Sequence, residues 1–193
     1  MLLLDTQNTT LYNYNIIISI SQERRTVNLE LSRVVDAENI SLLSVLAKEI
    51  WTECYSEILS SGQIEYMTDK FLSSEAISNQ ITNDKYEYYF IKDEGKIVGF
   101  TAFAIKDKSL FLSKLYVKKE CRRKGCAGFV MEYLEKRCRE DKLPFIWLTV
   151  NVNNHNAINS YKKKGFYIFK DECTDIGNGY FMDDHFMKKE IDY

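Results

Sequence analysis

Residues 110–127 read LFLSKLYVKKECRRKGCA, and they predict a strand, a basic turn and the start of a helix. The strand is expected at 110–117, and apolar side chains recur at helical spacing over 125–141. The first N–H groups of a helix have no intrahelical partner, and the helix dipole adds about half a positive charge there. Gly125 lacks a Cβ atom, so an anion can approach the backbone closely. The stretch therefore predicts a site for a phosphorylated ligand.

The turn is strongly basic, and Glu120 is its one acidic residue. Its cations are Lys118, Lys119, Arg122, Arg123 and Lys124. A Walker-type loop would end in Gly-Lys-Ser/Thr, whereas Gly125-Cys126-Ala127 stands here. The three glycines of the dinucleotide fingerprint are absent as well. Taken alone, the stretch leaves an ordinary solvated loop as the alternative.

A second pattern follows the strand-like residues 145–152 and reads Asn154-x-x-Ala157-x-x-x-Tyr161-x-x-x-Gly165-Phe166. Together with Arg122-x-x-Gly125-x-Ala127, and in this order, it resembles the GNAT superfamily of N-acetyltransferases. The resemblance runs from about residue 27 to the C-terminus. Residues 177–184, with residues 147–150 and 161–163, look like the branch that includes polyamine acetyltransferases.

Composition limits the class of protein. A chain of 193 residues with 45% apolar and 28% charged residues suits one soluble domain, and the net charge of −2 gives no general attraction to nucleic acid or acidic membranes. Five cysteines occur without a C-x-x-C pair, which indicates free thiols in a cytoplasmic protein and no metal site. No apolar run is long enough to span a membrane.

Periodicity predicts the order of the elements. Strands are expected at 27–34, 86–92, 97–105, 110–117, 145–152, 166–173 and 179–191, and helices at 36–58, 63–71, 73–81, 125–141 and 154–164. Residues 86–117 form an antiparallel meander, while 145–152 follows a strand–helix–strand path and should pair parallel to its predecessor. The fold class is therefore α/β (α+β): a mixed, mostly antiparallel central sheet with helices on both faces.

The GNAT fold has the same order, and the resemblance implies a splay between the two central parallel strands. Residues 26–193 are expected to form a single acetyltransferase domain. Residues 1–25 are expected to be an N-terminal extension, within which the apolar residues 16–20 could form an isolated strand.

The resemblance implies that the cofactor is acetyl-coenzyme A. Its pantetheine amides would satisfy backbone groups that the splay leaves unpaired, and its diphosphate would bind the basic turn. The implied cofactor-binding residues are Leu115, Tyr116, Val117, Arg122, Arg123, Lys124, Gly125, Cys126, Ala127, Gly128, Asn154 and Tyr161. Asn154 also suits a helix cap. A cationic turn could lower the pKa of Cys121 or Cys126, and this leaves a nucleophilic thiol as an alternative.

The resemblance also implies catalytic roles. Tyr161 would be the general acid that protonates the departing thiolate, because a tyrosine keeps its proton at neutral pH. The backbone N–H of Leu115 would stabilise the oxyanion. Many family members carry a glutamate near the position of Ser113 or Lys114, and this chain lacks it. The candidate general bases are therefore Glu65, Asp183 and Asp184, or a chain of water molecules.

Substrate recognition is expected from the helices after the first strand, through Trp51, Tyr55, Ile64, Tyr66 and Met67. The expected reaction is direct acetyl transfer from acetyl-coenzyme A to a primary amine, with a small amine or polyamine favoured. Acetylation of a protein or peptide amine, and a non-catalytic acyl-coenzyme A-binding module, remain as alternatives. The expected partner is a small-molecule amine, neither nucleic acid nor a membrane is expected, and a homodimer stays open.

Overall fold

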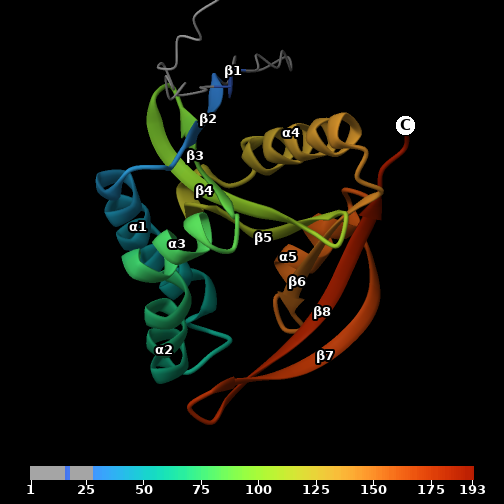
Figure 1. The fold of residues 1–193 in the computed structure, drawn as a ribbon. Coiled ribbons are helices and arrows are strands. Elements are labelled where there is room, and N and C mark those ends of the chain that lie inside the picture. The colour runs from blue at the N-terminus through green and yellow to red at the C-terminus, as the bar shows by residue number, and fades with distance from the viewer. Residues whose placement is uncertain (1–15, 18–27) are drawn as a thin grey trace, which may run out of the picture.

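The computed structural model describes residues 16–17 and 28–193. Its eight-stranded sheet has the order β1-β2-β3-β4-β5-β6-β8-β7 (Figure 1). The strands are β1 Ile16–Ile17, β2 Leu29–Arg33, β3 Glu87–Asp93, β4 Lys96–Lys106, β5 Ser109–Val117, β6 Phe145–Asn151, β7 Tyr167–Gly177 and β8 Tyr180–Glu190. The helices are α1 Ala37–Tyr55, α2 Ser61–Leu72, α3 Ser74–Thr82, the 3-10 helix η1 Lys119–Cys121, α4 Cys126–Asp141 and α5 His155–Lys162. Among the described strands only β5 and β6 pair in parallel, which confirms the mixed, mostly antiparallel sheet.

Helices cover both faces of the sheet, as the sequence predicts. Helices α1, α2 and α3 pack on one face, where Tyr88 and Phe100 are among the fully buried side chains (Figure 1). Helices α4 and α5 pack on the other face, against a core that includes Phe129 and Leu148. In the part of the chain that the structure describes, no helix combines the length and the apolar character needed to cross a membrane.

The two central strands separate along their length. Strands β5 and β6 pair only at Leu110↔Ile146 and Phe111↔Trp147, although β5 continues to Val117 and β6 to Asn151. Each strand stays paired on its other side, β5 with β4 and β6 with β8. The facing edges beyond Phe111 and Trp147 therefore carry backbone groups without a strand partner, which confirms the expected splay.

A β-bulge distorts β5 next to the splay. The register between β4 and β5 shifts between Thr101 and Phe103, so that Ser113 and Lys114 together oppose one residue of β4. The Thr101 hydroxyl donates a hydrogen bond to the Lys114 carbonyl at 2.8 Å. Gly99 lies close by, and a Cβ there would stand 2.3 Å from the Tyr116 carbonyl oxygen. Bulges bend a strand locally, and this one lies where β5 diverges from β6.

Two element boundaries differ from those expected. The second helix was expected from residue 63, but α2 begins at Ser61, because Ser60 caps it by accepting a hydrogen bond from the Gln63 N–H at 3.2 Å. The last hairpin is longer than predicted, because Asn178 and Gly179 both adopt positive φ angles and connect Gly177 directly to Tyr180. Such a two-residue turn favours Asn-Gly, and this signal was present in the sequence.

The expected N-terminal extension of residues 1–25 lies outside the described residues except for Ile16–Ile17. This pair forms β1 and adds to the edge of the sheet, with Ile16 opposite Leu31 and Ile17 opposite Glu30. The strand suggested at residues 16–20 is therefore found in part.

Candidate active site

The basic turn leads from β5 into the start of α4. Helix η1 ends at Cys121 with Arg122 in the C-cap position, Arg123 has a φ of +61°, and Gly125 takes the capping position of α4 with a φ of +90°. A Cβ at Gly125 would meet no atom within 4 Å, so the space beside its backbone is open. The turn thus combines an accessible helix start with basic side chains, the arrangement that binds phosphate groups.

Helix α4 differs from the other α-helices of residues 28–193 at its start. Asp36, Ser60, Ser73 and Asn154 cap α1, α2, α3 and α5, each by accepting a hydrogen bond from a backbone N–H. Helix α4 has no side-chain cap, because Gly125 has no side chain to supply one. Its first N–H groups are therefore available to an external acceptor. Asn154 caps α5 as expected, because its side-chain oxygen accepts a hydrogen bond from the Ala157 N–H at 3.2 Å.

Two cations near the turn are placed in ways that the sequence did not reveal. The Arg122 guanidinium is bound within the protein: it donates to the Glu53 carboxylate at 2.8 Å and to the Val117 carbonyl at 3.0 Å. It thereby ties the turn to the end of α1. The Lys164 ammonium lies 3.7 Å from the place of a Cβ on Gly128, so it adds a positive charge beside the start of α4. Neither contact has a local sequence signal, since the partners are distant along the chain.

The thiol alternative is not supported at Cys126. Its side chain is 4% exposed, and burial raises the pKa of the thiol. A protonated, buried thiol is a poor nucleophile. Cys126 can thus contribute its backbone to the turn, while its side chain belongs to the core.

Three tyrosines from different elements gather beside the splay. The hydroxyls of Tyr55 on α1 and Tyr116 on β5 are hydrogen-bonded at 3.2 Å. Tyr161 on α5 packs against Phe166, with ring centroids 5.5 Å apart. Burial raises the pKa of Tyr161, and the neighbouring Tyr55 raises it further. Tyr161 therefore keeps its proton at neutral pH, as a general acid requires. The hydroxyl of Tyr116 was not foreseen as part of the site.

Asp184 reaches the same cluster from β8. It stands opposite Asn151, the last residue of β6 and part of the splayed edge. Burial raises the pKa of the Asp184 carboxyl to about 6, with a further rise from Asp183 and an opposing effect of His185. Asp184 in turn raises the pKa of Tyr55, for which burial is the largest cause. A carboxylate with a pKa just below neutral is suited to accept a proton at physiological pH.

Two buried polar side-chain atoms in the described part of the chain have no hydrogen-bond partner: Trp51 Nε1 and Asp184 Oδ1. Both belong to this cluster. The Trp51 ring lies 4.6 Å from that of Tyr55 and 6.1 Å from that of Tyr116. Unpaired buried polar atoms cost free energy, so each of these two is available to pair with a bound molecule.

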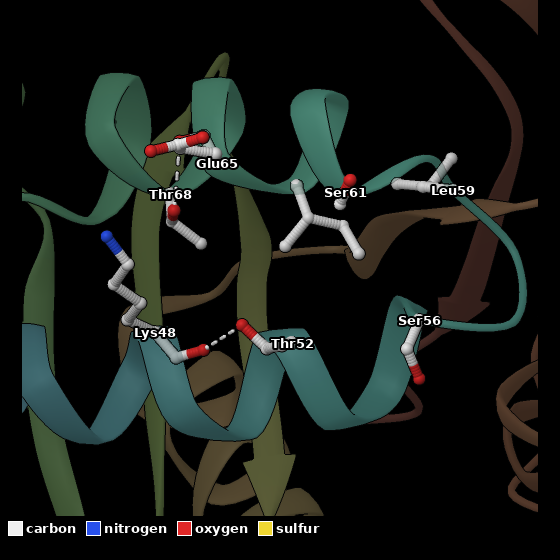
Figure 2. A pocket seen from close by; sticks show the side chains of 8 residues that line it. Lys48, Thr52, Ser56, Leu59, Ser61, Glu65 and Thr68 are labelled. Carbon is white, nitrogen blue, oxygen red and sulfur yellow. Dashed lines mark hydrogen bonds between the residues drawn. The ribbon is translucent and has the colours of Figure 1, made fainter.

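The remaining predicted residues do not join the cluster. Asp183 is exposed, and its backbone carbonyl accepts a hydrogen bond from the Val152 N–H at 3.0 Å. Glu65 is exposed and lines a separate cleft of about 250 Å³ between α1 and α2, together with Lys48 and Thr52 (Figure 2). Ile64 and Met67 are core residues of α2, and Tyr66 binds the β7–β8 hairpin.

Lys114 stands at the bulge, near the position at which many family members carry a glutamate. Its ammonium lies 2.9 Å from the Tyr88 hydroxyl and 3.3 Å from the Gln80 side-chain oxygen, so it is held by β3 and α3. Burial, with a smaller effect of Lys106, lowers the pKa of Lys114 to about 7. The position thus carries a weakly basic amine in place of a carboxylate.

Comparison with known proteins gives the family. A model of the acetyltransferase (GNAT) family matches residues 46–166, more than half of the chain. An uncharacterized N-acetyltransferase in the pepI 3′ region of Lactobacillus delbrueckii subsp. lactis is 20% identical over 165 residues, covering 81% of this chain and 95% of that protein.

Solved structures share the fold. The PaiA N-acetyltransferase of Thermoplasma acidophilum, in complex with coenzyme A, has a TM-score of 0.69 and 23% identity, with 86% of this chain and 99% of that chain covered. A GCN5-related N-acetyltransferase of Rhodopseudomonas palustris has the same TM-score and 16% identity, with 83% and 94% covered. The family match and the shared fold confirm the resemblance found in the sequence: the chain belongs to the acetyltransferase (GNAT) family, whose acyl donor is acetyl-coenzyme A.

Proposed function

We propose that the protein transfers an acetyl group from acetyl-coenzyme A directly to the primary amine of a small molecule, with a polyamine or a similar compact amine favoured. The observation that carries the proposal is the Asp184 carboxylate, which has an unpaired buried oxygen, stands opposite Asn151 at the splayed end of β6 and is close enough to Tyr55 to raise its pKa. A partly buried carboxylate with an unpaired oxygen is a suitable receptor for an ammonium group.

The residues present are suited to bind acetyl-coenzyme A. The uncapped start of α4 and the side chains of Arg123, Lys124 and Lys164 supply donors and positive charge for a diphosphate. The unpaired edges of β5 and β6 supply backbone partners for amides of an extended chain. Arg122 contributes by fixing the turn to Glu53. When bound, acetyl-coenzyme A supplies a thioester whose carbonyl carbon the amine attacks.

In this proposal, one residue is assigned to each step of the acetyl transfer. Asp184 accepts a proton from the incoming ammonium, which leaves a neutral, nucleophilic amine. The Leu115 N–H, at the bulge of β5, donates to the carbonyl oxygen as negative charge develops there. Tyr161 donates its proton to the departing sulfur and regains one from the acetylated nitrogen, which becomes a neutral amide, while Asp184 releases its proton to solvent. Glu65 and Asp183 have no step, because they lie outside the cluster.

A cytoplasmic location is part of the proposal. All five cysteines, of which Cys173 is exposed, are free thiols. Free thiols persist in reducing compartments.

Release of free thiol from acetyl-coenzyme A tests the function directly. The assay presents polyamines, amino acids and short peptides as acceptors, with an acceptor-free reaction as the blank. We expect amine-dependent thiol release with at least one small amine. Binding of the coenzyme without thiol release from any acceptor would favour the non-catalytic module instead.

Asp184→Asn tests the proposed base. In the wild-type protein kcat/KM should rise as the pH passes through about 6, because the carboxylate accepts a proton only when ionised. The asparagine variant should lose this rise and be slower by about tenfold at pH 8, where water replaces the base only in part. A pH profile of thiol release measures both effects. An unchanged profile would exclude Asp184 as the base.

Asp184→Asn should lower activity but raise the free energy of unfolding. The folded-state pKa lies above the ordinary value of 3.8, so the folded protein favours the protonated form. The cost of ionised Asp184 is therefore absent below about pH 4 and complete above about pH 6. After allowance for partial exposure, Asp184→Asn should add about 1 kcal/mol to the free energy of unfolding at pH 8 and nothing at pH 4. Urea unfolding at the two pH values measures the difference, and a gain of equal size at both would contradict it.

A further inference from the structure

Helix α2 binds the tip of the β7–β8 hairpin through side chains on one of its faces. The Tyr66 hydroxyl donates to the Ile176 carbonyl at 2.7 Å, and the Lys70 ammonium donates to the same carbonyl at 2.6 Å. The Gln63 side-chain amide donates to the Phe181 carbonyl at 2.8 Å. Residues at spacings of three and four share a face of a helix, so α2 directs this face at the hairpin. We call these contacts the α2–hairpin junction.

Two glycines allow the partners of the junction to approach closely. A Cβ on Gly177, which has a φ of +89°, would stand 2.6 Å from the Tyr66 hydroxyl oxygen. A Cβ on Gly62 would stand 2.7 Å from the Tyr180 hydroxyl oxygen. The rings of Tyr66 and Tyr180 lie 5.5 Å apart. The junction is therefore closely fitted on both sides, and a side chain at either glycine would displace a tyrosine hydroxyl from it.

The junction lies on the same hairpin as the proposed acceptor site. Tyr180 begins β8 and Asp184 follows four residues later, which is about 13 Å along an extended strand. Between them, Met182 packs into the core formed with α1 and α2. The hairpin thus runs from Asp184 to α2, and its tip reaches across to that helix (Figure 1). On this side the junction ties the hairpin to α2.

We propose that the α2–hairpin junction makes the enzyme selective for a small free amine and excludes amines carried on a polypeptide. The inference rests on the proposed function and names the residues that restrict the acceptor: Gln63, Tyr66 and Lys70. A peptide that delivered its amine to Asp184 from this side would have to separate α2 from the hairpin. That separation breaks three hydrogen bonds and one aromatic contact. A compact cation reaches Asp184 without separating α2 from the hairpin.

A matched pair of glycine variants tests the junction. Gly177→Ala and Gly179→Ala both place a side chain at a positive φ in the same turn, +89° and +75°, but only the first meets Tyr66. Gly177→Ala should raise KM for the best small amine by about fivefold. It should also lower the ratio of kcat/KM for that amine to kcat/KM for a lysine peptide by about tenfold. Gly179→Ala should stay within about twofold of wild type, and coenzyme affinity should be unchanged in both.

A double variant opens the junction without added bulk. Tyr66→Phe with Lys70→Met removes both donors to Ile176 and keeps the ring near Tyr180. It should shift selectivity toward the peptide as Gly177→Ala does. Lys48→Met is its control, because Lys48 contacts Asp69 on a different side of α2, and it should leave selectivity unchanged.

The results separate this inference from the proposed function. Thiol release with small amines, together with a selectivity shift in the junction variants alone, supports the inference. Wild-type enzyme that acetylates lysine peptides as efficiently as the best small amine would overturn it and leave acetyl transfer intact. Identical selectivity in Gly177→Ala and Gly179→Ala would also overturn it. Failure of every acceptor to release thiol would overturn the function itself.

Discussion

Tyr161→Phe is expected to lower kcat for acetyl transfer by about a hundredfold, since proton transfer by a positioned acid is typically worth this much or more. The substitution removes one hydroxyl and keeps the ring that packs against Phe166. Burial holds the proton on the wild-type hydroxyl at neutral pH, so the variant lacks a donor for the departing sulfur. Steady-state thiol release measures kcat, and calorimetric titration with coenzyme A measures affinity, which should be nearly unchanged.

Tyr167→Phe is the matched control, because that tyrosine is exposed on β7 and bonds Glu190. It should retain wild-type turnover. If Tyr161→Phe keeps full activity, the acid is another group. If it loses activity and coenzyme affinity together, the tyrosine acts in binding and the proton-donor role is wrong.

Gly125→Glu should abolish measurable coenzyme binding, with affinity reduced by at least about a hundredfold. The glutamate side chain would enter the open space beside the start of α4, where the proposal places the diphosphate. Its negative charge would repel a phosphate and occupy the positive end of the helix dipole. The φ of +90° adds backbone strain, which costs about 1–2 kcal/mol for a residue with a Cβ.

Gly179→Glu controls for strain and charge. It has a positive φ of +75°, its Cβ would also meet no atom within 4 Å, and it lies at the tip of the distant β7–β8 hairpin. Thermal unfolding checks that both variants are folded, and calorimetric titration with coenzyme A compares them. Equal affinity in Gly125→Glu and Gly179→Glu would show that the phosphates bind elsewhere.

Sequence alone predicted the features that depend on local pattern. The order of strands and helices, the parallel pair β5–β6 and the uncapped start of α4 follow from periodicity, from the strand–helix–strand path and from Gly125. The Asn178-Gly179 turn was not predicted, although Asn-Gly favours such a turn, and it fixes the long final hairpin.

The site was predicted less completely, because its members meet only in three dimensions. Asp183 and Asp184 were equivalent candidates in the sequence. Alternation along β8 separates them: Met182 and Asp184 share the face toward α1 and α2, while Asp183 is exposed. Contacts such as Arg122–Glu53 and Tyr66–Ile176 join residues far apart along the chain, so no local pattern could reveal them.

The unfinished pairing between β5 and β6 has a thermodynamic consequence. Beyond Phe111 and Trp147 the two strands share no ladder pairs, so a molecule bound between them would complete the hydrogen bonding of the sheet. A ligand that binds the native state alone shifts the unfolding equilibrium by mass action, by about 2.7 kcal/mol at a hundredfold excess over Kd. The thermal stability of this enzyme therefore depends on the concentration of its acyl donor. In cells depleted of that donor, the protein should unfold at a measurably lower temperature.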